Sequence, residues 1–225
     1  TARFYFSDEK KTRSLQLDLS KIKLKTNWIK RKDSIFYHQS VESTIKTAFE
    51  AYREDSNNKK KIVVADCQTN GVGSYNKKWL NIPYKDIALT VILGESLYFE
   101  QELVDDTCQA VINTLKNWGI EGYLKKPNDI YVNNRKISGI LLNKYFGNVP
   151  PGAYAQLGYT GRTNIQYLSV GLNVNSNAEI RFFDENAKVE STSFFRETGE
   201  IFSREKVLNY LIHQIDIAIQ KQVHQ

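Results

Sequence analysis

The sequence predicts an α+β domain with a mixed, largely antiparallel β-sheet flanked by helices. About seven short apolar runs have the length and composition of strands. Three longer segments repeat apolar residues at helical spacing, and the hairpin signals cluster in the middle of the chain. With 225 residues, of which 41% are hydrophobic, the chain can bury the core of one medium-sized domain.

The first elements separate a polar start from the main domain. Residues 1–33 are irregular and basic, and we expect them to form an N-terminal extension to a domain spanning 34–225. A short strand is predicted at 34–39. The segment after it, "ESTIKTAFEAYRED", predicts a helix capped near Ser43, because a hydroxyl there can accept a backbone N–H of the first turn.

The middle of the chain alternates buried strands with one strong helix. Apolar runs at 60–68 and 86–93 predict buried strands. Residues 101–118 predict an amphipathic helix that ends at Gly119. One stripe of this helix is apolar: Leu103, Val104, Cys108, Val111, Ile112, Leu115 and Trp118.

The C-terminal third supplies two more strands and the last helix. Residues 153–160 and 165–174 have strand composition. Ser203 is in position to cap the final helix, whose apolar positions again follow helical spacing. These are Val207, Leu208, Leu211, Ile212, Ile215 and Ile219.

A hairpin at residues 129–138 carries charged side chains on apolar strands. Asn133-Asn134 favours a two-residue type I′ turn, because Asn tolerates positive φ. Side chains alternate along strands, so Asp129 and Lys136 are expected on one face, diagonal to each other. They either form a surface ion pair or share a ligand. The predicted pairs are Val132 with Arg135, Tyr131 with Lys136, Ile130 with Ile137, and Asp129 with Ser138.

Two further stretches have the composition of binding loops. The stretch "ADCQTNGVGSYNKKW" follows a buried strand with glycines and cations, as a loop that binds a phosphate or carboxylate would. It has neither the P-loop nor the dinucleotide pattern. The stretch "LSVGLNVNSN" breaks a strand at Gly171 and exposes Asn173, which either caps a turn or presents its amide to a purine.

Composition excludes several classes of protein. No run approaches the ~18 apolar residues of a membrane span, and the start lacks the apolar region of a secretory signal. Cys67 and Cys108 are expected as core thiols in a reducing compartment. Residues 1–61 hold 15 basic and 8 acidic side chains, but the lysines are scattered, so nucleic-acid binding is not favoured. A chain without methionine is expected to be a fragment or a processed form.

The order of these motifs resembles the catalytic domain of the biotin protein ligases. The resemblance covers about residues 34–220, and "VGLNVNSNAEI" is similar to the eukaryotic branch, the holocarboxylase synthetases. The block Pro-Asn-Asp followed by Lys-x-x-Gly is the most specific part. The matching residues are Glu42-Ser43-Thr44, Gln68, Gly71, Gly73, Lys78-Trp79, Lys125, Pro127-Asn128-Asp129, Lys136, Gly139, Leu141, Gly171 and Asn173.

This resemblance implies a class II synthetase-like fold and a cytoplasmic enzyme that converts biotin and ATP to biotinyl-5′-AMP. Biotin would then pass to a lysine in the carrier domain of a biotin-dependent carboxylase. Mg²⁺ would arrive with ATP, without a direct metal site in the protein. The implied catalytic residues are Lys136 and Asp129. The implied biotin-binding residues are Ser43, Thr44, Gln68, Gly71, Val72, Gly73, Trp79, Lys136 and Gly139. The implied ATP- or adenylate-binding residues are Lys77, Lys78, Lys125, Asn128, Asp129 and Asn173.

The sequence departs from the family pattern in its loop and near its end. Val72 stands where the family has arginine in Gly-Arg-Gly, Ser74 where bacterial members often have another arginine, and Lys126 where the family has tryptophan. From the resemblance we expect the small C-terminal β-barrel of the family to be absent or truncated. Three alternatives stay open: a lipoate or octanoate ligase or transferase, a catalytically impaired biotin-binding module, and a basic RNA-associated protein.

Overall fold

The structure confirms the predicted mixed, largely antiparallel sheet. Seven strands form one sheet in the order β1-β2-β3-β7-β6-β5-β4, and β8 pairs with β9. Strands β1 and β2 are parallel, and the other neighbours in the large sheet are antiparallel. The computed structural model describes residues 15–29, 34–54, 61–74, 78–94, 100–147, 163–177, 180–182 and 188–223.

The elements follow the predicted order. The strands are β1 (Ile35–Val41), β2 (Lys61–Gln68), β3 (Ile87–Gly94), β4 (Tyr123–Lys125), β5 (Asp129–Val132), β6 (Arg135–Gly147), β7 (Thr163–Leu172), β8 (Ile180–Phe182) and β9 (Lys188–Glu190). The helices are η1 (Leu19–Lys21), α2 (Thr44–Glu54), α3 (Glu100–Lys116), α4 (Phe194–Thr198) and α5 (Arg204–Val223). The predicted strand at 153–160 lies outside the described residues.

Both predicted N-caps are confirmed. The Ser43 hydroxyl accepts the backbone N–H of Lys46 at 3.1 Å, and the Ser203 hydroxyl accepts that of Lys206 at 3.3 Å. Gly119, at φ +72°, follows α3 as predicted. No helix in the described part of the chain has the length and hydropathy needed to cross a membrane.

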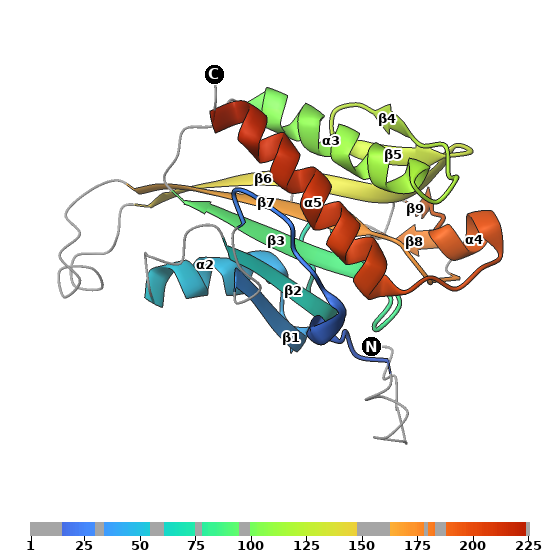
Figure 1. The fold of residues 1–225 in the computed structure, drawn as a ribbon, viewed down its shortest axis with the longest axis horizontal. Helices are drawn as coiled ribbons and strands as arrows, with labels where there is room; N and C mark the ends of the chain where they lie inside the picture. Colours follow the sequence, from blue (N-terminus) through green and yellow to red (C-terminus); the bar gives the residue numbers. More distant parts are fainter. Residues whose placement is uncertain are drawn as a thin grey trace.

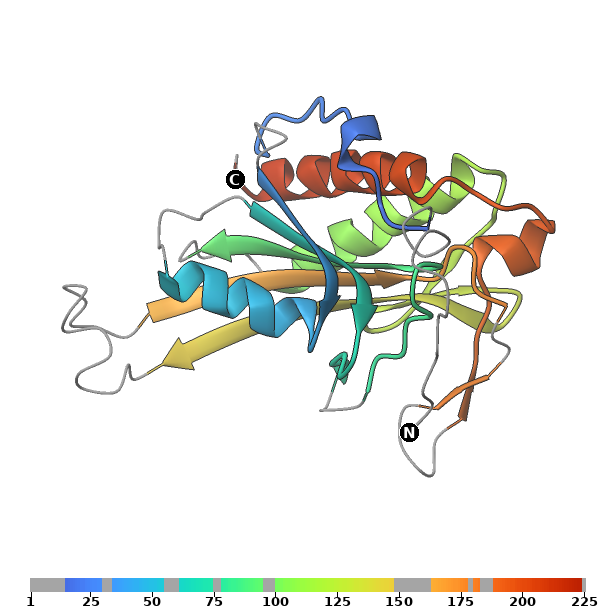
Figure 2. The same cartoon turned by 90° about the horizontal axis from the view of Figure 1, so that it is seen from below.

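Helices cover both faces of the sheet. Helices α3 and α5 lie side by side on one face, and α2 lies on the other (Figures 1 and 2). The predicted stripe of α3 is confirmed, because its apolar residues belong to the main core with those of α5. A smaller cluster forms beneath α2, where Ala48 and Tyr52 pack on Ile165 and Tyr167 of β7. Ser169 and Gly171 continue this face of β7, since side chains alternate along a strand.

Residues 15–29, within the predicted extension, lie along α5 and contribute to the core (Figure 1). Four of their side chains, Leu17, Ile22, Trp28 and Ile29, are buried. The carboxylate of Asp216 on α5 accepts the backbone N–H groups of Asn27, Trp28 and Ile29 at 2.7–3.0 Å. The described part of this segment is therefore packed on the domain, and the division at residue 34 stays a prediction.

A buried ion pair joins the same segment to β2. Arg204 contacts Asp66 at 2.6 Å, and both side chains are at most 5% exposed. The guanidinium also donates to the Leu15 carbonyl at 2.6 Å, and Asp66 accepts the Tyr37 hydroxyl and the Leu17 N–H. Burial, together with this hydrogen bond to Asp66, raises the pKa of Tyr37 far above its usual value. The pair fixes β2 two residues before Gln68.

The hairpin forms as predicted at its turn but not along its whole length. Asn133 and Asn134 have φ of 49° and 61°, as a type I′ turn requires. The pairs of Val132 with Arg135 and of Tyr131 with Lys136 are confirmed.

The next two predicted pairs are wrong. Ile130 is opposite Ser138, and Asp129 is opposite Gly139, because a register shift inserts Ile137 as an extra residue in β6. The shift lets Ile137 join the core while Lys136 and Gly139 both face the α2 side.

Both cysteines are free thiols, as predicted. Cys108 is buried in α3, and burial raises its pKa to about 12. Cys67 is half-buried, so the prediction that it lies in the core holds only in part.

Candidate active site

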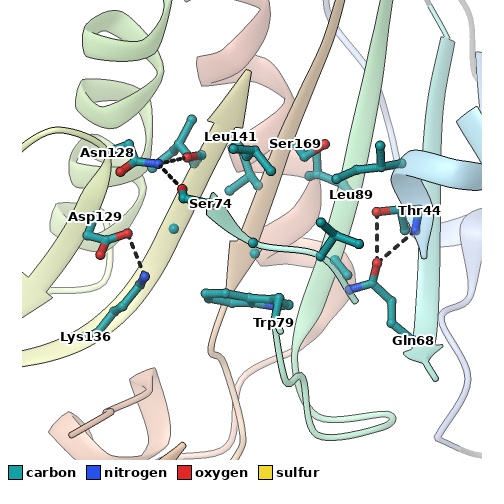
Figure 3. A pocket seen from close by; sticks show the side chains of 18 of the residues that line it. Thr44, Gln68, Ser74, Trp79, Leu89, Asn128, Asp129, Lys136, Leu141 and Ser169 are labelled. Carbon is teal, nitrogen blue, oxygen red and sulfur yellow. Dashed lines mark hydrogen bonds and ion pairs between the residues drawn. The ribbon is translucent and has the colours of Figure 1, made fainter. Parts of the chain in front are cut away.

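A cavity of about 230 Å³ opens on the α2 face of the sheet, between the first turn of α2 and the β5–β6 hairpin (Figure 3). Polar groups lie at its two ends and apolar groups between them. Its lining is Thr44, Ile45, Gln68, Val72, Gly73, Ser74, Trp79, Ala88, Leu89, Pro127, Asn128, Asp129, Lys136, Gly139, Ile140, Leu141, Ser169, Val170 and Gly171.

One end of the cavity carries an ion pair. The Lys136 ammonium lies 2.6 Å from a carboxylate oxygen of Asp129, with 13% and 29% of the side chains exposed. The same ammonium lies 5.5 Å from the centre of the Trp79 ring. The two charges therefore face a partly enclosed space. The alternative of an ion pair on a solvated surface does not agree with the structure.

The backbone of Lys136 is held from outside the hairpin. Its carbonyl accepts the Thr192 N–H at 2.9 Å and the Asn173 side-chain amide at 3.4 Å. The Glu197 carboxylate, from α4, accepts Asn133 and Arg135 of the turn at 2.8 Å each. These contacts fix the hairpin, so the direction in which the ammonium points is set before any ligand arrives.

The other end of the cavity is polar and uncharged. The Gln68 side-chain oxygen accepts the Thr44 N–H at 2.8 Å and the Thr44 hydroxyl at 3.1 Å. The Thr90 hydroxyl lies 2.9 Å from that of Thr44 and 2.9 Å from that of Ser169. One hydrogen-bonded group thus joins the last residue of β2 to the start of α2 and to the centres of β3 and β7.

An aromatic floor separates the two ends. The Trp79 indole covers Gly171 and Gly139, which pair with each other across β6 and β7. A methyl group at Gly171 would lie 2.2 Å from the indole, and one at Gly139 would lie 3.1 Å from it. Gly71 holds the backbone of Trp79, since its carbonyl accepts the Trp79 backbone N–H at 2.8 Å. A Cβ at Gly71 would lie 2.5 Å from the Trp79 backbone carbonyl oxygen. Gly139 and Gly171 therefore leave room for the ring against the sheet, and Gly71 leaves room for the Trp79 backbone.

The glycine-containing loop borders the cavity at Val72, Gly73 and Ser74. Val72 is 41% exposed and forms a β-bridge with Lys78. The Asn128 amide donates to the Ser74 hydroxyl at 3.0 Å, and this contact joins the loop to the start of the hairpin (Figure 3). The loop therefore presents an apolar side chain and a hydroxyl where the family pattern has arginines.

The structure brings most of the predicted residues together. Nine of them line the cavity: Thr44, Gln68, Val72, Gly73, Trp79, Asn128, Asp129, Lys136 and Gly139. Gly71 is next to the cavity-lining Val72, and its carbonyl accepts the backbone N–H of Trp79. What each residue binds is still a prediction.

Four predicted residues lie elsewhere, and one cannot be placed. The Ser43 hydroxyl caps α2, and Lys125 lies over the Tyr131 ring at 4.4 Å. Lys78 is exposed beside Val72. Asn173 is 1% exposed behind the hairpin, where its amide also donates to the Thr192 carbonyl at 2.8 Å. Lys77 is outside the described residues.

Sequence reasoning missed Thr90, Ser169 and Leu89, and it named Ser74 and Leu141 in the family pattern without assigning them to the site. Thr90 and Ser169 are paired residues in the centres of two buried strands. A hydroxyl within an otherwise apolar strand was the available signal. Its meaning depends on the strand order, because β3 and β7 are far apart in sequence.

The described residues contain no cluster of three or more His, Cys, Asp or Glu side chains able to hold a metal ion. Asp129 is the one carboxylate among the residues that line the cavity. A single carboxylate fits an Mg²⁺ ion that is held mainly by the phosphates of a nucleotide.

Comparison with known proteins identifies the family. Residues 37–158 match the family model described as "Biotin/lipoate A/B protein ligase family". This chain belongs to that family. The match is 25% identical over 181 residues to the bifunctional ligase/repressor BirA of Bacillus subtilis (strain 168), and it covers 79% of this chain and 51% of that protein. The chain therefore spans about half the length of the curated relatives it matches.

Solved structures of the biotin/lipoate ligase family share the fold. The biotin protein ligase of Aquifex aeolicus, in complex with biotin and ATP, superposes with a TM-score of 0.63 at 24% identity, over 83% of this chain and 70% of that one. The Leishmania major enzyme with biotinyl-5-AMP gives 0.56 at 20% identity, over 83% and 75%. A biotin protein ligase-like protein of unknown function from Silicibacter gives 0.57 at 7% identity, over 90% and 75%. At such identities the likeness establishes the fold.

Proposed function

We propose that this protein joins biotin to ATP to form biotinyl-5′-AMP and passes biotin to a lysine of a carboxylase carrier domain. The observation that supports this most is the order of groups in the cavity. An ammonium stands at one end, apolar walls and an indole floor follow, and neutral hydrogen-bonding groups stand at the other end (Figure 3). Biotin has the same order, with a carboxylate, an alkyl chain and a cyclic urea.

Lys136 is suited to the chemistry at the carboxylate end. Adenylation brings a carboxylate against the α-phosphate of ATP, and two anions repel each other unless a cation offsets the charge. The ammonium is held in the cavity by Asp129 at 2.6 Å and by its fixed backbone, so it can contact both anions and the charge that develops between them. Mg²⁺, where bound with ATP, would offset further phosphate charge beside Asp129.

The polar end supports biotin over lipoate. The Gln68 amide nitrogen and the remaining lone pair of the Ser169 hydroxyl need partners when a ligand excludes water, because the other groups of this end bond one another. A cyclic urea can supply these partners, whereas a dithiolane or an alkyl chain leaves them unpaired. A site of this kind rejects the analogue without hydrogen-bonding groups by a large factor.

Asn173 supports a nucleotide site less directly. Its side-chain oxygen has no hydrogen-bond partner among the described residues, although the residue is buried. We propose that this oxygen, which is buried behind the hairpin in this structure, becomes accessible when ATP binds and then accepts a hydrogen bond from the adenine amino group. The amide nitrogen would keep its bonds to the Lys136 and Thr192 carbonyls.

The test is ATP–pyrophosphate exchange with purified protein, supplied in turn with biotin, lipoate or octanoate. We expect exchange with biotin and at least a hundredfold less with the other two acids. Lys136→Ala should lower the exchange rate by about 10²–10³, the usual cost of losing one electrostatic stabiliser. Lys116→Ala, an exposed lysine at the end of α3, is the matched control.

The outcomes separate the open alternatives. Exchange with lipoate or octanoate alone would refute the proposal in favour of the other branch of the family. Biotin binding without any exchange would identify an impaired binding module, which Val72 in the loop would explain. Full activity in Lys136→Ala would remove Lys136 from the chemistry.

A further inference from the structure

Four polar side chains form an unbroken hydrogen-bonded row at the neutral end of the cavity. The row runs from the Gln68 side-chain oxygen to the Thr44 hydroxyl at 3.1 Å, then to Thr90 at 2.9 Å and to Ser169 at 2.9 Å. Thr90 is fully buried, whereas Gln68, Thr44 and Ser169 line the cavity. Thr90 and Ser169 are partners in the register of β3 and β7.

The direction of each hydrogen bond in this row follows from counting protons. The Thr44 backbone N–H can only donate, so the atom of Gln68 that it contacts at 2.8 Å must be the oxygen. That oxygen can only accept, so the single hydroxyl proton of Thr44 points to it. Thr90 must then donate to Thr44, and Ser169 must donate to Thr90.

The row therefore has two different ends. At one end the Gln68 amide nitrogen faces the cavity with its two N–H donors (Figure 3). At the other end the Ser169 hydroxyl donates its hydrogen bond to Thr90, so its oxygen offers the cavity only lone pairs. Among the described residues, no other side chain donates a hydrogen bond to the Ser169 hydroxyl oxygen.

We propose that Ser169 is a specificity-determining residue that accepts an N–H group of the acyl substrate, and that Thr90 is the positioning residue that keeps Ser169 an acceptor. This inference rests on the proposed function and adds to it which groups the substrate must carry. A cyclic urea offers a carbonyl for the Gln68 amide nitrogen and an N–H for Ser169. An acid whose far end has no N–H leaves the cavity-facing lone pairs of the Ser169 oxygen without a donor in a dry site.

The first experiment is calorimetric titration of the purified protein with biotin and with octanoate. In Ser169→Ala the biotin N–H loses its acceptor, and we expect affinity for biotin to fall about five- to a hundredfold. Octanoate makes no hydrogen bond to Ser169, so its affinity should stay within about twofold. The ratio of the two affinities separates a lost hydrogen bond from a general disturbance of the cavity.

The second experiment tests the direction of the row. Thr90→Val keeps the shape but frees the Ser169 proton, so Ser169 can turn a donor toward the cavity and selectivity for biotin over octanoate should fall severalfold. Thr90→Ser keeps the row and should restore the selectivity. Thr107→Val is the matched control, because Thr107 is buried in α3 and its hydroxyl bonds the Leu103 carbonyl at 2.7 Å, away from the cavity.

The results distinguish this inference from the proposed function. Wild-type protein that binds biotin, together with Ser169→Ala that binds it equally well, would overturn the role of Ser169 and leave biotin as the substrate. Thr90→Val with unchanged selectivity would overturn the positioning role of Thr90. Wild-type protein that takes octanoate or lipoate but not biotin would overturn the proposed function, and the inference with it.

Discussion

Gly171→Ala is expected to displace the floor of the cavity. The added methyl group would lie 2.2 Å from Cε2 and 2.3 Å from Cζ2 of the Trp79 indole. Carbon atoms in contact prefer about 3.5–4.0 Å, so either the ring or strand β7 must move by roughly 1.3–1.8 Å. Strand β7 is paired on both sides, with β3 and β6, and cannot easily give way. The indole should therefore move into the cavity that it lines.

The expected cost follows from the usual effect of overpacking, about 1–3 kcal/mol. For a domain of this size, each kcal/mol lowers Tm by about 2–4 °C, so calorimetry should show a drop of roughly 2–12 °C. Titration with biotin should show at least a tenfold loss of affinity, because the ring then occupies the space of the alkyl chain. Gly139→Ala is the graded control, since its methyl group would lie 3.1 Å from the same ring and requires a shift of only a few tenths of an ångström.

The reasoning would be refuted by Gly171→Ala protein with the wild-type Tm and the wild-type affinity for biotin. Combining Gly171→Ala with Trp79→Phe provides a second check. The smaller ring removes the clash, so this double variant should recover part of the lost Tm. A double variant less stable than both single variants would show that the contact with the indole is not the cause.

Three further predictions concern the loop, the buried ion pair and the thiols. Val72→Arg should slow the loss of trapped radiolabelled biotinyl-AMP by about ten- to a hundredfold, because one charged hydrogen bond is worth about 1.5–3 kcal/mol. Equal release rates from the wild-type protein and the folded variant would contradict this. Arg204→Ala should lower the free energy of unfolding by about 3–5 kcal/mol in urea titrations, because Asp66 stays buried without its cation; a change below 1 kcal/mol would refute it. In native protein at pH 8, a thiol reagent should label the half-buried Cys67. Cys108 should react roughly 10³-fold more slowly than it does in denaturant, because burial raises its pKa to about 12. Labelling of both thiols at one rate would contradict this.

The hairpin shows both what the sequence could predict and where it could not. Asn133 and Asn134 define the turn, and the turn defines the first two residue pairs. The register shift at Ile137 was not predicted, because turn chemistry acts only on neighbouring residues. A signal was nevertheless present. Lys136 and Gly139 are three residues apart and would lie on opposite faces of a regular strand, so assigning both to one site already required a bulge.

Some of the predicted site residues lie in the cavity and others do not, for the same reason. Those fixed by local chemistry, such as Gln68 at the end of β2 and Lys136 beside the turn, lie in the cavity. Ser43 does not, because the orphan N–H groups at the start of α2 use its hydroxyl as a cap. Asn173 does not, because its amide joins the hairpin to the segment before α4. Side chains with two possible hydrogen-bonding roles cannot be assigned before their neighbours in space are known.

The contacts behind Lys136 have a consequence for how the family is recognised. The family match ends at residue 158, but the groups that hold the Lys136 backbone and the hairpin turn are Asn173, Thr192 and Glu197. The residues that fix the position of this ammonium therefore lie outside the part of the chain that the family model covers. A protein that keeps the Lys-x-x-Gly pattern but lacks these three partners would still match the family model, while its lysine would lack the backbone contacts that hold Lys136 here. A match to the family model alone therefore does not indicate whether the lysine of a relative is held as Lys136 is held here.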